Sequence, residues 1–146
     1  MTTTNPSLGK SGPPVFPIAL GCMGMGAGSW YGDSDEGESI ATIHTALERG
    51  VNLIDTGDFY SLGKNELLVG RALRGRRDQA LLSVKFGALR GPDGALLGFD
   101  ARPAAVKNSL AHSLSRLGVD PSTSTARPAS IRRCPSRTPS GPSRSS

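Results

Sequence analysis

Between residues 15 and 120, the chain alternates short apolar runs with longer segments whose apolar residues have helical spacing. The runs that predict strands are 15–20, 51–55 and 80–86, and the segments that predict helices are 38–50, 65–73 and 103–117. Strands separated by helices pair in parallel, because a crossover helix returns the chain to the same edge of the sheet. The alternation predicts an α/β fold with three βα units, which fits both a doubly wound sheet and a (β/α)8 barrel.

Several residues mark the ends of the predicted helices. Asp35 with Glu38 resembles a capping box at the start of the first helix, and Gly50 suits its end. Asn65 can cap the second helix, and Pro103 suits the first position of the third. The segment before Pro103 is predicted to be a loop.

Asp55, Tyr60 and Lys85 lie at or just beyond the ends of two successive predicted strands. Because the carboxyl ends of parallel strands meet at one rim, we expect the three side chains to face one mouth. A phenol is a weak proton donor at neutral pH, since its unperturbed pKa is about 10. A neighbouring ammonium stabilises the phenolate, and a buried carboxylate keeps that ammonium charged and oriented. The three residues therefore suit proton donation to a carbonyl group that is being reduced.

The same three residues also allow a purely structural interpretation. Asp55 can cap its own turn, Tyr60 can pack on the loop, and Lys85 can extend into solvent from the end of a strand. The spacing of the residues does not choose between the two interpretations.

Three stretches resemble the N-terminal part of an aldo-keto reductase, namely 21–24 (GCMG), 38–73 and 81–87 (LLSVKFG). The run NLIDTGDFY at 52–60 is the most specific part of this resemblance. It implies that residues 15–120 are the first three βα units of a (β/α)8 TIM barrel, which is incomplete in this chain. It also implies an NADPH-dependent oxidoreductase that binds the cofactor without a Rossmann domain and reduces a small aldehyde or ketone.

The resemblance also assigns roles to individual residues. Asp55, Tyr60 and Lys85 match three members of the catalytic tetrad of the family, with Tyr60 as the proton donor. The residues that match the nicotinamide end of the cofactor site are Gly21, Cys22, Met23 and Asp55, and Trp30 matches a wall of the substrate pocket. A reactive thiol at Cys22 is the less favoured alternative.

The glycines Gly24, Gly26 and Gly28 come close to a dinucleotide-binding fingerprint. That fingerprint requires a helix to start directly after the loop, because the helix N-terminus holds the pyrophosphate. No helix is predicted there, so this interpretation is disfavoured.

Neither the two histidines nor a short run of arginines indicates a functional site, and both are expected at ordinary surface positions. His44 and His112 lie within predicted helices without the spacing of metal ligands, so no metal site is expected. Arg74, Arg76 and Arg77 follow a predicted helix and are expected to face solvent.

The last 26 residues differ from the rest in composition. They hold five arginines, eight serines and five prolines but no acidic residue, so they account for the whole net charge of +5. Residues 1–14 and this Arg/Ser/Pro-rich tail at 121–146 are predicted to be disordered. Non-specific nucleic-acid binding by the tail, on a non-catalytic scaffold, is the alternative function that this composition allows.

The aldo-keto reductase pattern stops at Asp120, where a fourth apolar strand is expected. With free choice of third codon bases, 122–143 reads in another frame as an apolar, strand-containing segment. A one-base deletion after the Asp120 codon would explain the change, and the coding DNA tests this. A (β/α)8 barrel needs about 250 residues. We therefore expect an inactive fragment, with no fourth strand and an unpaired edge on the third.

Other classes of protein are excluded by simple counts. No stretch of 18 apolar residues occurs, and the first residues lack the apolar core of a secretory signal. Cys22 and Cys134 are the only cysteines, which is too few for a disulfide scaffold and suggests the cytoplasm.

Overall fold

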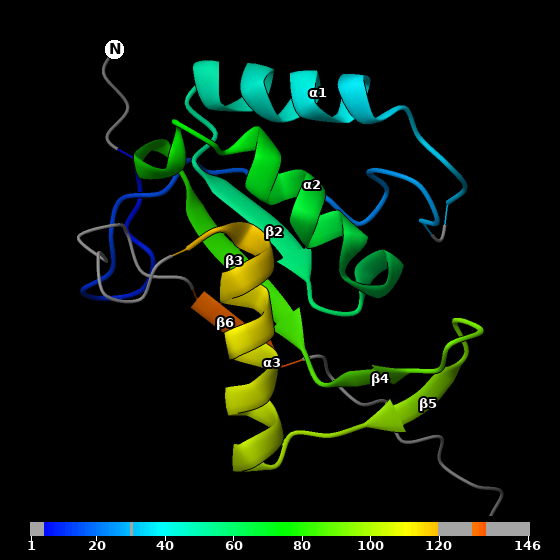
Figure 1. The fold of residues 1–146 in the computed structure, drawn as a ribbon. Coiled ribbons are helices and arrows are strands. Elements are labelled where there is room, and N and C mark those ends of the chain that lie inside the picture. Colours follow the sequence, from blue (N-terminus) through cyan, green and yellow to red (C-terminus); the bar gives the residue numbers. More distant parts are fainter. Residues whose placement is uncertain (1–4, 30, 120–129, 134–146) are drawn as a thin grey trace, which may run out of the picture.

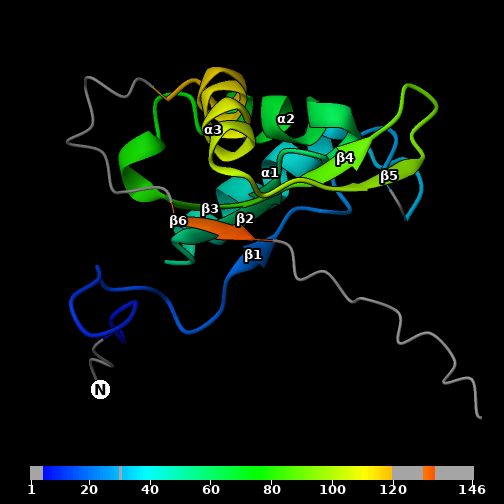
Figure 2. The ribbon, with the colours of Figure 1, turned by 90° about the horizontal axis from the view of Figure 1, so that it is seen from below.

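A computed structural model of the chain describes residues 5–29, 31–119 and the backbone of 130–133. Within this part, four parallel strands form a sheet in the order β1-β2-β3-β6, and three helices cover one face of it (Figures 1 and 2). The strands are β1 (Leu20–Gly21), β2 (Leu53–Gly57), β3 (Leu81–Phe86) and β6 (Ser130–Arg133). The helices are α1 (Glu36–Glu48), α2 (Lys64–Ala72) and α3 (Pro103–Leu117), with short 3-10 turns η1 (Tyr60–Gly63) and η2 (Arg77–Gln79). The prediction of a parallel α/β fold is confirmed for these residues.

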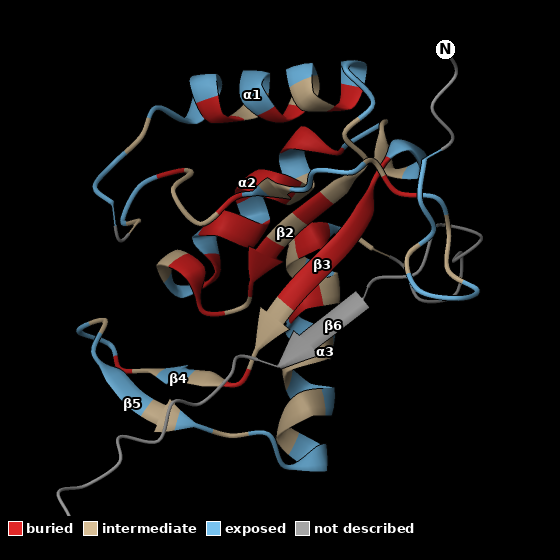
Figure 3. Ribbon diagram, turned by 180° about the vertical axis from the view of Figure 1, so that it is seen from behind, coloured by how far each residue is buried: buried red, intermediate tan, exposed pale blue. Residues whose placement is uncertain are grey.

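The hydrophobic core lies between the sheet and its helices (Figure 3). Ile54 of β2 and Leu82 of β3 are fully buried and share one cluster with Ile43 of α1 and Leu68 of α2. Complete burial of each such side chain stabilises the fold by roughly 1.5–3 kcal/mol. Successive side chains of a strand point to opposite faces. The residues between the core positions of β2 and β3 therefore point to the face that carries no helix.

The helix ends follow the capping residues in most places. The Asp35 side chain accepts a hydrogen bond of 2.7 Å from the backbone N–H of Glu38, and Gly50 has a φ of +88° just beyond α1. Pro103 is the first residue of α3, and Gly118 ends that helix in the left-handed conformation. These boundaries agree with the sequence predictions.

Asn65 does not cap α2, contrary to the sequence prediction. The N-cap residue is Gly63, and Asn65 lies inside the helix with 1% of its surface exposed. Its side-chain N–H groups donate to the carbonyl oxygens of Cys22 at 2.7 Å and Met25 at 2.9 Å. Its side-chain oxygen accepts a hydrogen bond of 2.7 Å from the Thr56 hydroxyl. Asn65 thus joins α2, β2 and the loop after β1.

The N-terminal segment differs from its prediction in two ways. The strand expected at 15–20 is reduced to Leu20 and Gly21, because Pro17 within it has no N–H for sheet pairing. Disorder is predicted for 1–14, but residues 5–14 form a turn that an antiparallel bridge between Ser7 and Pro14 closes. The Asn52 side chain fixes this turn by donating to the Pro14 carbonyl at 3.0 Å.

The segment between β3 and α3 is a hairpin rather than a plain loop. Its antiparallel strands are β4 (Ala88–Arg90) and β5 (Leu96–Phe99), which project away from the main sheet (Figure 1). Gly91 and Gly94 close the turn, since the N–H of Gly94 donates to the Gly91 carbonyl at 2.9 Å. Leu96, Leu97 and Phe99 remain exposed on this hairpin.

The prediction of an unpaired edge on β3 is wrong, because β6 pairs with that edge. The backbone of Ser130–Arg133 pairs in parallel with Ser83–Phe86 of β3, so part of the tail predicted to be disordered is a strand. An edge strand offers unpaired backbone groups to any extended segment, whatever its side chains. The rest of the predicted tail lies outside the described residues. Among the residues described, no helix has the length and apolar content needed to cross a membrane.

Candidate active site

Asp55 of β2 and Lys85 of β3 form an ion pair at the carboxyl ends of neighbouring strands. Register places Asp55 opposite Ser83, and Gly57 opposite Lys85. Because paired residues of parallel strands share a face, Asp55 and Lys85 both point to the side without helices. Their side chains keep 24% and 31% of their surface exposed, so a small molecule can reach the pair.

Tyr60 lies beside this ion pair in η1, directly after β2. The Lys85 ammonium nitrogen is 5.5 Å from the centre of the Tyr60 ring. A Cβ at Gly57 would lie 3.2 Å from the ring, so the glycine allows the phenol to rest against the end of β2. Phe59 supports the ring from the side with an edge contact of 4.9 Å between centroids. The structure thus brings the three predicted residues together at one end of the sheet.

The neighbours of Lys85 keep its ammonium group protonated. Burial lowers the pKa of the ammonium, but hydrogen bonding and charge at Asp55 and Tyr60 raise it, and the net shift is upward. Lys85 is therefore protonated at neutral pH. A fixed positive charge beside a phenol stabilises the phenolate that remains after the proton has left.

The loop after β1 approaches the same end of the sheet. Gly21 is paired with Asp55, and the N–H of Cys22 donates to the Asp55 carbonyl at 2.8 Å. Met23 lines a small cavity together with Tyr60. Gly21, Cys22 and Met23, three of the residues predicted to bind the cofactor, are therefore next to Asp55 or Tyr60, whereas Trp30 lies outside the described residues.

Cys22 is not a reactive thiol. It is fully buried, and burial together with the nearby carboxylate of Asp55 raises its pKa to about 12, against a smaller opposing effect of Lys85. The nucleophilic form of cysteine is the thiolate, which is almost absent at neutral pH in this environment. Cys22 instead fills the space behind the loop.

The glycine-rich loop is not a phosphate cradle. The N–H of Gly26 donates to the Ser34 hydroxyl at 2.7 Å, and that of Gly28 donates to the Asp33 carboxylate at 2.6 Å. The amides of two of the three fingerprint glycines are thus already bonded, one of them to a negative charge, and the first helix in the described part of the chain begins only at Glu36. The disfavoured dinucleotide fingerprint is rejected on this geometry.

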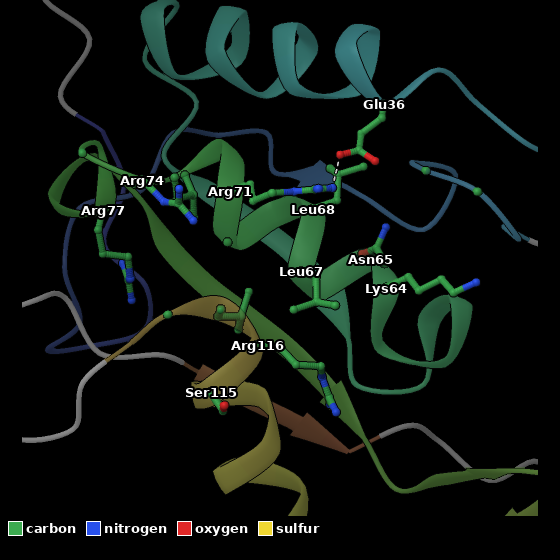
Figure 4. A pocket seen from close by; sticks show the side chains of 17 residues that line it. Glu36, Lys64, Asn65, Leu67, Leu68, Arg71, Arg74, Arg77, Ser115 and Arg116 are labelled. Carbon is green, nitrogen blue, oxygen red and sulfur yellow. Dashed lines mark ion pairs between the residues drawn. The ribbon is translucent and has the colours of Figure 1, made fainter.

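A cavity of about 750 Å³ lies between α2 and α3 and includes none of the three clustered residues (Figure 4). Arg71 on its wall pairs with Glu36, and Arg77 donates to the Ala80 carbonyl at 2.6 Å. Arg74 follows the end of α2, where a positive charge offsets the negative end of the helix dipole. Arg71 and Arg77 of this cavity thus have structural roles.

The histidines occupy the kind of position that the sequence predicts. His44 forms a hydrogen bond of 2.8 Å with the Ala72 carbonyl, which ties α1 to the end of α2. His112 is exposed on α3. Among the described residues, no group of three potential metal ligands occurs.

Sequence reasoning missed a buried ion pair between Glu66 of α2 and Arg116 of α3. The Arg116 Nε donates to the Glu66 carboxylate at 2.5 Å, and the glutamate side chain is fully buried. The two residues are 50 positions apart. Each looks like an ordinary charged residue of an amphipathic helix, so no local pattern reveals the pair.

A comparison with protein-family models matches residues 17–122 to the aldo/keto reductase family. The match covers more than half of the chain and includes the whole cluster of Asp55, Tyr60 and Lys85. The relatives in this family include oxidoreductases. The protein belongs to the aldo/keto reductase family.

Comparisons with individual curated proteins and solved structures also find aldo-keto reductases. The aldo-keto reductase YhdN of Bacillus subtilis is 37% identical over 116 residues, which are 78% of this chain and 34% of YhdN. The structure of the aldo-keto reductase AKR11C1 from Bacillus halodurans is 35% identical with a TM-score of 0.65, covering 81% of this chain and 38% of that one. An aldo/keto reductase from Klebsiella pneumoniae, solved with NADP and acetate, is 28% identical with a TM-score of 0.55, covering 73% and 33%. This chain spans only about a third of the curated relative's length.

Proposed function

We propose that the described residues form the proton-donating part of an aldo-keto reductase site that reduces an aldehyde or ketone with NADPH. The observation that carries the proposal is the contact of three side chains. Lys85 is paired with Asp55, and its ammonium lies 5.5 Å from the centre of the Tyr60 ring. In this proposal, β1 to α3 correspond to the first three βα units of a (β/α)8 barrel.

Tyr60 acts as the general acid in the proposed reaction. Its hydroxyl donates a proton to the carbonyl oxygen of the substrate, while NADPH, when bound, supplies hydride to the carbonyl carbon. The proton transfer leaves Tyr60 as a phenolate, and the adjacent Lys85 ammonium stabilises this charge. Asp55 keeps the ammonium charged and directed toward the ring.

Residues 21–23 with Asp55 would hold the nicotinamide end of the cofactor. No atom lies within 4 Å of the position that a Cβ of Gly21 would take, so a flat ring can approach the backbone there. Met23 shares a cavity with Tyr60, which puts this loop next to the proton donor. Trp30 as a wall of the substrate pocket stays a prediction from the sequence.

The fit of the described residues is limited to that one end of the cofactor. The amides of Gly26 and Gly28 are occupied by Ser34 and Asp33, so these two amides are not available to a pyrophosphate. A complete barrel needs about 250 residues. We therefore infer that the chain by itself is an inactive fragment.

The isolated 146-residue chain is expected to neither bind NADPH nor reduce aldehydes. Titration with micromolar NADPH should leave the fluorescence of Trp30, the single tryptophan, unchanged after correction for absorbed light. Saturable quenching by NADPH, reversed by excess NADP, would show that the chain forms a complete cofactor site. YhdN treated in the same way is the positive control.

The catalytic proposal itself is tested in a chimera. Residues 17–119 replace the matching part of YhdN, which then supplies the remainder of the barrel. The chimera is expected to consume NADPH when a small aldehyde is added, as followed by the loss of NADPH absorbance. A folded chimera that binds NADPH but shows no aldehyde-dependent consumption contradicts the proposal.

The alternative of a nucleic-acid-binding tail stays a prediction, because most of the tail lies outside the described residues. A salt titration of the chain against duplex DNA tests it, since five phosphate contacts give a steep dependence of affinity on salt. A cytoplasmic location likewise stays a prediction from the sequence.

A further inference from the structure

The turn directly after Tyr60 has an unusual backbone. Ser61 and Leu62 have φ values of +49° and +54°, and Gly63 follows with +87°. Three successive residues are therefore left-handed, two of them with side chains that disfavour this conformation. A strained backbone of this kind persists only where its surroundings hold it. Something must therefore hold this turn in place.

The side chain of Arg116 lies against this turn. A Cβ built on Gly63 would come within 3.0 Å of the Cδ and Nε atoms of Arg116. The glycine thus allows the arginine to rest directly on the backbone of the turn. Figure 4 shows Arg116 extending from α3, well apart from Arg74 and Arg77.

The carboxylate of Glu66, just after the turn, holds Arg116 in place. Glu66, three residues after Gly63, accepts the 2.5 Å hydrogen bond from Nε. Burial raises the pKa of Asp58, two residues before Tyr60, and the positive charge of the same guanidinium opposes that rise. Through Arg116, helix α3 is joined to the exit of the loop that carries Tyr60.

We propose that Arg116 is a positioning residue that holds the strained turn at 61–63 and so fixes the ring of Tyr60 beside Lys85. This inference rests on the proposed function, because fixing the ring of Tyr60 matters for catalysis only if Tyr60 is the proton donor. Arg116 itself belongs to α3 and acts through the turn, not on the substrate. Helix packing alone would make it a general stabiliser of α2 and α3.

Chemical accessibility separates these two roles in the full chain. Tyr60 is 6% exposed and Tyr31 is 78% exposed, so tetranitromethane should modify Tyr31 much faster. In Arg116→Gln the charged hydrogen bond to Glu66 is lost together with the guanidinium that lies on Gly63, and Tyr60 should be nitrated about tenfold faster. Nitration at each site is followed by mass spectrometry of peptides. Cys22 is fully buried, so its lack of reaction with a thiol reagent reports that the core is intact.

Matched variants complete the experiment. Arg102→Gln, at the exposed start of α3, should leave both tyrosines unchanged. Arg116→Lys keeps the charge but loses the planar group that lies on Gly63, so it should give a smaller increase at Tyr60 with Cys22 still protected. If Arg116→Gln exposes Cys22, the test passes to Arg116→Lys, in which faster nitration of Tyr60 with Cys22 still protected supports the positioning role.

An unchanged Tyr60 rate with Cys22 protected overturns the positioning role. So does an increase at Tyr60 that occurs only together with exposure of Cys22, because that pattern indicates general unfolding. The measurement needs neither NADPH nor turnover. A failed chimera with accelerated nitration in Arg116→Gln would thus refute the proposed reaction and leave the positional effect intact.

Discussion

Replacing Tyr60 by phenylalanine in the chimera is expected to lower kcat for aldehyde reduction by about a thousandfold. Phenylalanine keeps the ring on Gly57 and the edge contact with Phe59 but removes the only proton that the ring can donate. Because the hydroxyl acts in the transition state, KM should change little in comparison. Steady-state rates with saturating NADPH measure both constants.

Tyr31→Phe is the matched control for this substitution. Tyr31 is exposed and is not part of the cluster around Lys85, so its loss should change kcat by less than about twofold. If Tyr60→Phe keeps more than a tenth of the rate, another group donates the proton and Tyr60 is not the general acid.

The second large effect is expected on stability. Replacing Asn65 by alanine should lower the free energy of unfolding of the chain by about 3 kcal/mol, since three buried hydrogen bonds are lost. The Thr56 hydroxyl and the carbonyls of Cys22 and Met25 would be left without this partner. Urea unfolding followed by circular dichroism measures the change.

Asn108→Ala is the matched control, because Asn108 is exposed on α3. It should alter the free energy of unfolding by less than about 0.5 kcal/mol. Equal stabilities of the Asn65→Ala variant and the parent chain would show that the three hydrogen bonds do not hold the loop after β1 to α2.

The sequence predicts the central strands and helices well, because the patterns that indicate them involve only residues that are near in sequence. The apolar runs of β2 and β3 and the spacing in α1 and α3 depend on side chains that are near in sequence. The meeting of Asp55 and Lys85 is predictable from the sequence, since parallel strands end at a common edge. The position of Tyr60 depends in addition on Gly57, which leaves room for its ring.

The other features depend on contacts that no local rule describes. Asn65 looks like a helix cap, but its amide is used by residues about 40 positions earlier in the chain. Glu66 and Arg116 meet only because α2 packs on α3. The pairing of β6 with β3 is made by the backbone, and the serines and arginines of the tail do not indicate it.

The family match ends at residue 122, two residues beyond the position at which the sequence predicts a change of reading frame. That prediction concerns the DNA, and the coding sequence decides it. If another frame downstream of the Asp120 codon continues the reductase pattern, a deletion explains the tail. If none does, the tail has another origin.

The most direct test of the proposed site is Lys85→Met in the chimera. Methionine has a similar length but no charge, so it removes the ammonium that pairs with Asp55 and stabilises the phenolate of Tyr60. The account predicts a loss of about a hundredfold in kcat at neutral pH, while Lys107→Met, at an exposed position of α3, retains the parent rate. A Lys85→Met chimera that turns over within about twofold of the parent would contradict the account.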